Sequence, residues 1–314
     1  MARLPPVVVV LTGPTGAGKS RLALELAART PVELINMDSA QVYRGLDIGT
    51  AKPDAATQAQ VRHHLIDIRD PAQSYNAGEF VRDARACIEA CQQRGRVPVL
   101  VGGTLLYLRA LRRGLATLPA ADAAVRRALE ARAASLGWPA LHAELARVDP
   151  AAAARIHAND AQRIQRALEV FELTGRPISI LQAETRGLDA DYRWLAFALV
   201  PADRAALQAR LAQRFNAMLA AGLVGEVGSL YRRGDLTEHH PAVRSVGYRQ
   251  LWRHLAGRCS LAEATTAAIQ ATCQLAKRQM TWLRSETGLQ PLDPEQLSAS
   301  SAVFESVARS AGTC

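Results

Sequence analysis

The stretch that decides the fold is Val7-Val-Val-Val-Leu-Thr-Gly-Pro-Thr-Gly-Ala-Gly-Lys-Ser20. Its apolar first half predicts a β-strand, and the spacing of Leu22 and Leu26 behind it predicts a helix. The second half matches G-x-x-x-x-G-K-[ST], a loop whose backbone N–H groups turn toward phosphate oxygens beside a helix N-terminus. We therefore predict a site for a diphosphate or triphosphate, formed by Gly13, Pro14, Thr15, Gly16, Ala17, Gly18, Lys19 and Ser20.

Two side chains of this loop carry chemistry of their own. Lys19 would bring a positive charge to the terminal phosphates, and the Ser20 hydroxyl would bind Mg²⁺. The loop recognises phosphates and not a base, so it does not decide which phosphorylated compound binds. ATP hydrolysis would also need an acidic residue at the end of a second strand to hold Mg²⁺, and only Asp38 and Asp67 fit that position, loosely.

The rest of the chain predicts an α/β core with a helical insertion. Short apolar runs predict strands at residues 7–12, 32–38, 64–68, 97–101 and 194–200. Because helical segments alternate with them, we expect a parallel sheet flanked by helices, as in P-loop NTPases. Residues 115–191 are rich in Ala and Arg, with helical periodicity and no convincing strand. We therefore assign residues 1–114 and 192–314 to the core and 115–191 to the insertion, with a sparse Ser/Ala tail from Ser298.

One helix of the insertion is well delimited by its sequence. Asn159 or Asp160 would cap its start, and Gly175 would end it. Three apolar residues recur at helical spacing and are predicted to form its buried stripe: Ile164, Leu168 and Phe171.

Composition and charge limit the classes of function. The 314 residues are 49% hydrophobic and 21% charged, which is typical of a globular protein large enough for two domains. A net charge of +9 favours a polyanionic partner, although a basic enzyme would look the same. No apolar run approaches the roughly 20 residues of a membrane span. The five cysteines lack zinc-ligand spacing, so we expect reduced thiols in a cytoplasmic, monomeric protein with no membrane partner.

Asp38 is the acidic residue of most interest. It ends the predicted strand after the loop helix, and ligands gather at the carboxyl ends of parallel strands. A carboxylate there would bind Mg²⁺, bind a substrate hydroxyl or take a proton from a nucleophile. The alternative is that Asp38 or Ser39 simply caps a helix.

Further stretches carry a resemblance to a known family, in matching order from about Val7 to Arg284. After the phosphate loop they are Asp38-Ser-Ala-Gln-Val-Tyr-Arg-Gly-Leu-Asp-Ile-Gly-Thr-Ala-Lys-Pro53, His64-Leu-Ile-Asp67, Val101-Gly-Gly-Thr-Leu-Leu-Tyr107, Arg244-Ser-Val-Gly-Tyr-Arg-Gln250 and Leu275-Ala-Lys-Arg-Gln-Met-Thr-Trp-Leu-Arg284. Together they resemble the bacterial tRNA dimethylallyltransferases, also called tRNA isopentenyltransferases. This ordered set is far more specific than one phosphate loop.

The resemblance implies a reaction and a role for three residues. Dimethylallyl diphosphate would give its five-carbon group to N6 of the adenine on the 3′ side of the anticodon, in tRNAs that read codons beginning with uridine. The loop would then hold the diphosphate of this donor, with Mg²⁺ as cofactor. Thr15 would contact that diphosphate, and Asp38 would accept the N6 proton. Arg214 would be a second cation on the diphosphate, with Arg210 one helical turn away as the alternative.

The resemblance also implies a surface for tRNA. Residues near the phosphate loop would line a channel for the target nucleotide, the insertion would grip the anticodon stem-loop, and C-terminal cations would contact phosphates. A solvated helix face is the alternative for any one of these cations. The predicted tRNA-binding set is Asp38, Ser39, Ala40, Gln41, Thr104, Arg126, Gln162, Arg163, Arg166, Arg244, Arg249, Lys277, Arg278 and Arg284. Trp252 and Trp282 are predicted to be core.

Three other functions fit part of the sequence. A small-molecule P-loop kinase would consume ATP and would use Asp38 to bind an acceptor hydroxyl. An isopentenyltransferase acting on free AMP or ADP would need neither the insertion nor the C-terminal cations. A non-catalytic RNA-binding protein would need neither Lys19 nor Asp38.

Overall fold

The computed structural model describes residues 5–116, 118–185 and 187–311. The chain divides into two compact units, one formed by Met1–Leu111 with Asp189–Cys314 and the other by Arg112–Leu188. The insertion expected from the sequence, 115–191, begins and ends slightly later than this second unit. Within the described ranges, no helix has both the length and the apolar character that crossing a membrane requires.

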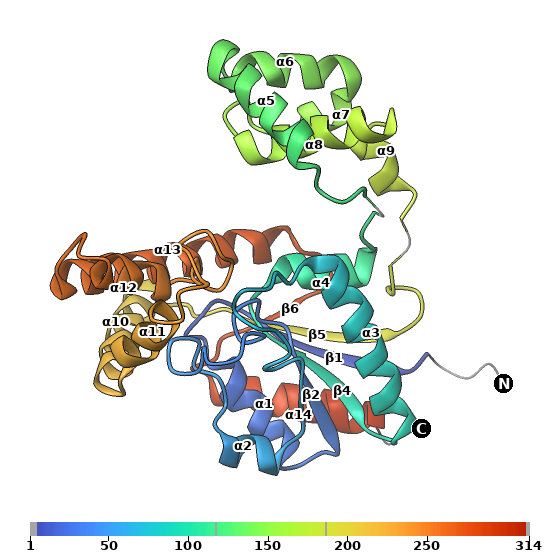
Figure 1. The fold of residues 1–314 in the computed structure, drawn as a ribbon. Coiled ribbons are helices and arrows are strands. Elements are labelled where there is room, and N and C mark those ends of the chain that lie inside the picture. Colours follow the sequence, from blue (N-terminus) through green and yellow to red (C-terminus); the bar gives the residue numbers. More distant parts are fainter. Residues whose placement is uncertain (1–4, 117, 186, 312–314) are drawn as a thin grey trace. The chain divides into compact units, whose positions relative to one another are not determined.

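The first unit is built on a six-stranded sheet whose paired strands all run parallel (Figure 1). The strand order is β3-β2-β4-β1-β5-β6, so the strand that leads into the phosphate loop lies between two other strands. The bounds are β1 Val7–Thr12, β2 Val32–Asn36, β3 His63–His64, β4 Val97–Val101, β5 Arg193–Leu199 and β6 Gln290–Leu292.

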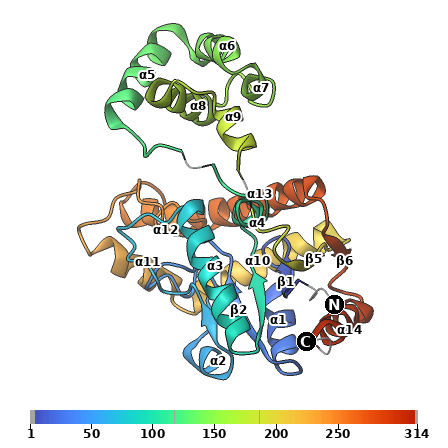
Figure 2. The same cartoon turned by 90° about the vertical axis from the view of Figure 1, so that its right-hand side faces the viewer.

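Helices cover both faces of this sheet, which confirms the predicted fold class (Figure 2). On one face α1 and α14 pack together over β1, and on the other α3 packs on β2 and β4. The bounds in this unit are α1 Lys19–Ala27, α2 Ala55–Gln60, α3 Ala77–Gln93, α4 Leu105–Arg113, α10 Arg204–Ala220, α11 Leu223–Tyr231, α12 Tyr248–Leu255, α13 Leu261–Ser285 and α14 Leu297–Ala311.

Two predicted strands are shorter than expected. Of the strand predicted at 32–38, only residues 32–36 form β2. The chain turns after Asn36, whose side chain accepts a hydrogen bond from the Asp38 N–H and donates one to the Asp38 carbonyl. The run at 64–68 contributes only His64 to β3, because Leu65 and Asp67 have φ angles of 61° and 57°. Residues in that left-handed region cannot continue an extended strand.

The C-terminal prediction was wrong. The expected Ser/Ala tail is helix α14, and β6 before it adds an edge strand beside β5. Val303 and Val307 are fully buried in the core that also holds α1. The guanidinium of Arg29 lies 4.5 Å from the centre of the Phe304 ring. Two valines among serines and alanines form too narrow an apolar stripe to stand out in the sequence.

The second unit is helical and has its own core. Its helices are α5 Ala123–Leu136, α6 Trp138–Val148, α7 Pro150–Ala153, α8 Ala161–Thr174 and α9 Ile178–Ala183. As predicted, Asp160 caps α8 and Gly175 ends it in a left-handed conformation. Ile164 and Leu168 are buried, but Phe171 is only partly buried and Val170 is fully buried instead. The reason is that α5, α6 and α9 all contact α8, so its buried side is wider than one stripe.

Candidate active site

The phosphate loop borders a cavity of about 420 Å³ in the first unit. The loop runs from β1 into α1 and passes close to the end of β5. The approach is so close that a Cβ at Gly13 would lie 2.5 Å from the Leu199 carbonyl oxygen. Gly18 has a φ of 86° and caps α1 without a side-chain hydrogen bond to the first turn. The first amides of α1 therefore keep no side-chain partner at the cap, as a phosphate site requires.

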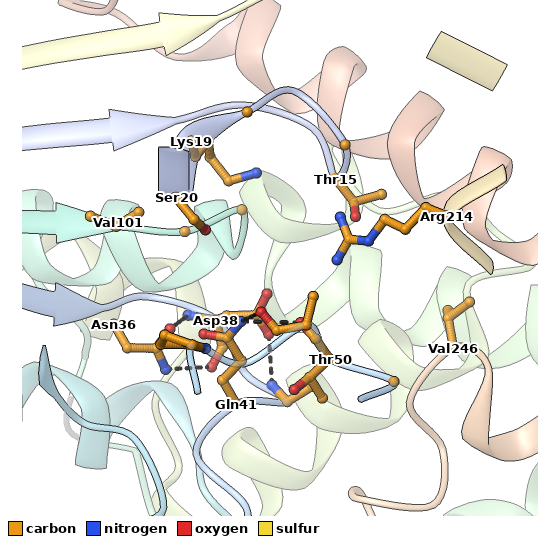
Figure 3. A pocket seen from close by; sticks show the side chains of 18 of the residues that line it. Thr15, Lys19, Ser20, Asn36, Asp38, Gln41, Thr50, Val101, Arg214 and Val246 are labelled. Atoms are coloured by element: carbon orange, nitrogen blue, oxygen red, sulfur yellow. Dashed lines mark hydrogen bonds between the residues drawn. The ribbon is translucent and has the colours of Figure 1, made fainter. Parts of the chain in front are cut away.

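Two cations from distant parts of the chain reach this cavity. Lys19 donates to the carbonyl oxygens of Gly13 and Pro14 at 3.0 and 2.8 Å. Burial lowers the pKa of Lys19 to about 8; nearby Asp38 opposes the shift and Arg214 adds to it. Burial also lowers the pKa of Arg214, which extends from α10 toward Thr15 (Figure 3). Burial removes water from both cations, and a bound anion in the cavity would compensate for that loss.

Of the two candidate arginines of α10, the structure places Arg214 and not Arg210 at the cavity. Arg214 lines the cavity, whereas Arg210 forms an ion pair with Glu295 and is not among the lining residues. One helical turn therefore divides a cation aimed at the cavity from one already matched by an acid.

Asp38 lies in a tight turn beneath the two cations (Figure 3). Its Oδ1 accepts a hydrogen bond from the Ala40 N–H at 2.9 Å, and its own N–H donates to Asn36 Oδ1 at 3.1 Å. The alternative that Asp38 caps a helix is wrong, because the carboxylate stabilises a turn and the next helix, α2, begins at Ala55. Among the described residues, no hydrogen bond is found for Oδ2, which leaves it as a proton acceptor.

The remaining residues of the predicted nucleotide channel lie around this turn. Ala40 and Gln41 line the cavity. Ser39 is exposed, and its N–H donates to Thr104 Oγ1 at 3.1 Å. Thr104 is therefore held beside the turn although it follows β4, more than sixty residues later in the chain.

Gln279 of α13 is a site residue that sequence analysis missed. Its Oε1 accepts from the Thr15 N–H at 2.9 Å, and its Nε2 donates to the Gly103 carbonyl at 3.0 Å. It thus joins the phosphate loop to the loop after β4. Gln279 lies inside one of the stretches that carry the family resemblance, but its partners are too far along the chain for spacing to reveal them.

The predicted C-terminal cations are all on the surface. Ser245, Val246 and Tyr248 line the cavity, while the cations next to them in sequence are exposed. The exposed set is Arg244, Arg249, Lys277, Arg278 and Arg284. Trp252 is buried as predicted. Trp282 is only partly buried, and the guanidinium of Arg109 lies 4.8 Å from its ring centre, so its assignment to the core was wrong.

In the second unit, two predicted tRNA-binding arginines are paired within the protein. Glu169 is fully buried and accepts hydrogen bonds from Arg126 at 2.8 Å and Arg166 at 2.6 Å. Its burial raises the carboxyl pKa, but the two guanidinium groups outweigh this and the net shift is downward. Gln162 and Arg163 are exposed, and Arg163 pairs with Asp160. Their contact with tRNA remains a prediction.

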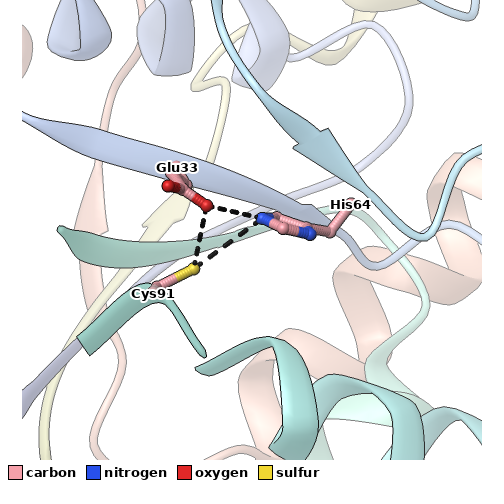
Figure 4. A group of neighbouring side chains, drawn as sticks. All are labelled: Glu33, His64 and Cys91. Atoms are coloured by element: carbon pink, nitrogen blue, oxygen red, sulfur yellow. Dashed lines mark hydrogen bonds and ion pairs between the residues drawn. The ribbon is translucent and has the colours of Figure 1, made fainter. Parts of the chain in front are cut away.

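A second group of side chains resembles a metal site but is already charge-balanced. Glu33, His64 and Cys91 offer ligand atoms within 4.8 Å of one another (Figure 4). Arg94 donates to both oxygens of Glu33, at 3.0 and 2.6 Å. Its guanidinium therefore supplies the positive charge that a metal ion would otherwise bring. Burial, with Glu33 nearby, raises the pKa of the Cys91 thiol to about 12, which keeps it protonated. The group fastens β2, β3 and α3 together.

Comparison with known proteins identifies the family. The sequence model of one family, described as IPP transferase, matches residues 41–286. The chain belongs to the IPP transferase family. The matched segment begins at Gln41, three residues after Asp38, and contains the basic stretch around Arg249 and all of α13.

Named relatives in this family match nearly the whole chain. The tRNA dimethylallyltransferase of Bordetella petrii is 57% identical over 303 residues, 96% of each chain. That of Bordetella pertussis is 59% identical over 90% of this chain and 91% of its own. A tRNA isopentenylpyrophosphate transferase structure from Bacillus halodurans has a TM-score of 0.71 at 35% identity and covers 98% of this chain and 97% of its own.

A eukaryotic relative resembles the fold as well. The crystallographic structure of a eukaryotic dimethylallyltransferase acting on tRNA has a TM-score of 0.78 at 27% identity. It covers 97% of this chain and 79% of its own length. The cores of both units are thus matched in proteins named for action on tRNA.

Proposed function

We propose that this protein transfers the dimethylallyl group of dimethylallyl diphosphate to N6 of the adenine on the 3′ side of the anticodon, in tRNAs that read codons beginning with uridine. The observation that carries the proposal is that Lys19, Arg214 and Asp38 border one cavity. Two cations suit a departing diphosphate, and a carboxylate suits the proton that the amine must lose. The cytoplasm, where tRNA is available, is the proposed location.

The reaction balances with these groups alone. The adenine N6 lone pair forms a bond to C1 of the donor while the C1–O bond breaks. The bonding electron pair leaves with the diphosphate, whose new negative charge Lys19, Arg214 and the loop amides stabilise. The extra N6 proton passes to Asp38. Because the adenine must reach a cavity in the protein, it has to leave the base stack first.

The residues present fit a magnesium ion bound together with the donor. Ser20 lines the cavity beside Lys19, and its hydroxyl and the diphosphate oxygens are the hard ligands that Mg²⁺ prefers. When bound there, Mg²⁺ would add positive charge on the leaving diphosphate. Lys19 would still bind the phosphates, and Thr15 would border them.

The kinase alternative is weaker on one observation. A Walker-type kinase needs an acid to hold its metal, and Asp67 was one of two sequence candidates. Its Oδ1 lies 2.6 Å from the Nζ of Lys52, a side chain that is 3% exposed. The remaining candidate, Asp38, uses Oδ1 to stabilise its own turn and leaves only Oδ2 for a metal.

A transfer assay tests the proposal. The protein would be mixed with labelled dimethylallyl diphosphate, Mg²⁺ and one acceptor: tRNA, AMP, or ATP with a small alcohol. We expect label in tRNA only, and in the adenine next to the anticodon of tRNAs that read U-initial codons. Label entering AMP alone, or phosphate transfer from ATP, would overturn it.

The role of Asp38 needs a matched variant. Asp38→Asn keeps the acceptor for the Ala40 N–H but removes the base. We expect transfer to fall by roughly 10²-fold or more, the usual contribution of general base catalysis, with donor affinity unchanged. A rate within a few-fold of the wild type would show that another group takes the proton.

A further inference from the structure

A loop without regular structure forms one wall of the cavity. Gly49, Thr50 and Ala51 of residues 46–51 line it. The loop is closed by its own hydrogen bond from Thr50 Oγ1 to the Leu46 carbonyl at 2.6 Å. A chain segment of this kind needs outside contacts to keep one conformation, because its backbone N–H groups have no strand or helix partner.

Glu226 of α11 supplies those contacts. Its Oε2 accepts from the Asp47 N–H at 3.0 Å and the Ile48 N–H at 2.7 Å. Its Oε1 accepts from the Gly49 N–H at 3.1 Å. Three successive amides thus converge on one carboxylate, and hydrogen bonds to a charged acceptor are about twice as strong as neutral ones.

Tyr248 of α12 completes the arrangement at the same carboxylate. Its hydroxyl donates to Glu226 Oε1 at 2.5 Å. Burial, with Glu226 close by, raises the phenol pKa, so the hydroxyl stays protonated and remains a donor. The Tyr248 side chain lies against Gly49, where a Cβ would approach two ring carbons and the hydroxyl oxygen within 2.6–2.7 Å. Only glycine at position 49 lets the loop, the ring and the carboxylate meet.

The far side of the loop reaches the catalytic turn. Gln41 Nε2 donates to the carbonyl oxygens of Thr50 and Ala51, at 3.1 and 3.3 Å. Gln41 stands three residues after Asp38, and both line the cavity. A continuous series of hydrogen bonds therefore leads from Glu226, through the backbone of residues 47–51, to the turn that carries the base.

We propose that Glu226 is a positioning residue for the target nucleotide. By fixing residues 47–51 it holds Gln41, and with it the turn that places Asp38 against the amine. This inference rests on the proposed function. The hydrogen bonds found for Glu226 go to residues 47–49 and to Tyr248 and not to the phosphate loop, so its role concerns the acceptor and not the donor.

Glu226→Gln is the test variant, because it keeps the shape and one acceptor oxygen. Its amide nitrogen would face two of the donors that Glu226 now satisfies, and each unsatisfied donor is costly. We expect kcat/KM for tRNA to fall about tenfold or more while the Kd of dimethylallyl diphosphate stays within about twofold. Glu305→Gln is the matched control, an exposed acid on α14 whose ion pair is with Arg309, one helical turn later. It should leave both constants unchanged.

A double-mutant cycle separates positioning from a general loss of stability. Gln41→Met keeps the length of the side chain but removes its donors to the loop. Because Glu226 and Gln41 act on two ends of one segment, their effects on kcat/KM for tRNA should be strongly non-additive. Additive effects, or equal losses of donor and tRNA affinity, would overturn the inference.

The same assay distinguishes the two proposals. If the wild type transfers no label to tRNA, the proposed function fails. If the wild type is active and Glu226→Gln matches it, only the inference fails. Should Glu226→Gln not fold, as judged by its melting curve, Tyr248→Phe removes one hydrogen bond and keeps the ring. It should show a smaller loss of the same kind, and an unchanged kcat/KM for tRNA would overturn the inference.

Discussion

Lys19 is held where its charge is costly without a ligand. Burial brings its pKa down from 10.5 to about 8, within reach of ordinary assay conditions. Below that pH the side chain is charged and attracts a diphosphate, and above it the side chain becomes neutral. A bound diphosphate restores the charge, so proton uptake and donor binding are linked.

Donor affinity should therefore weaken as the pH rises through about 8. Lys19→Arg keeps the charge across this range, so its affinity, although weaker because of its different shape, should change little between about pH 7 and 9. Calorimetric titration of dimethylallyl diphosphate at several pH values would measure both. A wild-type profile as flat as that of the variant would contradict the assignment.

The two arginines of α10 form a natural pair of test and control. Arg214→Gln removes a cation from the cavity and should lower kcat/KM for the donor by about 10²-fold, as expected for losing one group that stabilises developing charge. Arg210→Gln, one turn away and paired with Glu295, should change it by less than about threefold. Steady-state kinetics with varied donor would compare them, and equal losses would show that both contact the diphosphate.

Residues of the site differed in how readily the sequence revealed them. The phosphate loop is contiguous, so its pattern alone predicted strand, loop and helix. Arg214 depended on the family resemblance, since a lone arginine on a helix has no distinguishing spacing. Gln279 and Glu226 were missed because their partners lie 264 and more than 170 residues away. Such contacts exist only once the sheet and α10–α13 have come together.

Among the elements, the edge of the sheet at β2 and β3 depends on one charge cluster. Arg94 holds the pKa of Glu33 near 2; burial opposes this shift, and His64 and Cys91 support it. Because the native value lies below the ordinary value of 4.5, Glu33 stabilises the fold above about pH 4.5. That contribution is lost as the pH falls toward 2.

Glu33→Gln should lower the free energy of unfolding at pH 7 by about 2 kcal/mol, the scale of hydrogen bonds to a charged group, since it removes the carboxylate that Arg94 and His64 contact. It should also flatten the loss of stability between about pH 4.5 and 2. Urea unfolding at several pH values would show this. Glu89→Gln, on α3 in an exposed pair with Arg85, should change the free energy by less than about 0.5 kcal/mol.

Element boundaries followed the sequence where patterns were strong and local. Strands 7–12 and 97–101 were predicted at their observed bounds. The run at 64–68 looks extended in composition, yet Leu65 and Asp67 are left-handed. Aspartate tolerates that conformation better than most residues, but nothing about Leu65 indicates it. Helix α14 was missed because its stability comes from burial of two valines against α1, a tertiary contact that propensity does not contain.

In the molecule as a whole, each unit buries its own apolar core. Leu129, Leu145 and Ile164 belong to the core of the second unit, and the sheet with α1 and α14 forms that of the first. The change to an Ala- and Arg-rich texture was enough to predict this division. The chain leaves the first unit after Leu111 and returns to it at Asp189. The composition does not change sharply at either point, and the predicted boundaries were a few residues later.

Replacing residues 112–188 with a short Gly/Ser linker should leave the first unit folded. All the described residues that line the cavity belong to this unit, so donor affinity should stay within about threefold of the wild type, whereas transfer to tRNA should be lost. Calorimetry and the transfer assay would test the two halves of this prediction. Transfer to tRNA at the wild-type rate would show that the helical unit is dispensable.

The buried Glu169 of the helical unit lowers the positive charge that this unit can offer to tRNA phosphates. Glu169 neutralises part of what Arg126 and Arg166 would otherwise present to a polyanion. Each phosphate neutralised by an unpaired cation displaces condensed counterions and steepens the dependence of affinity on salt. Arg132 and Arg163 also pair with acids of the protein. A salt titration of tRNA binding should accordingly give a shallower slope than the number of arginines in α5 and α8 suggests, because four of them already have an anion beside them.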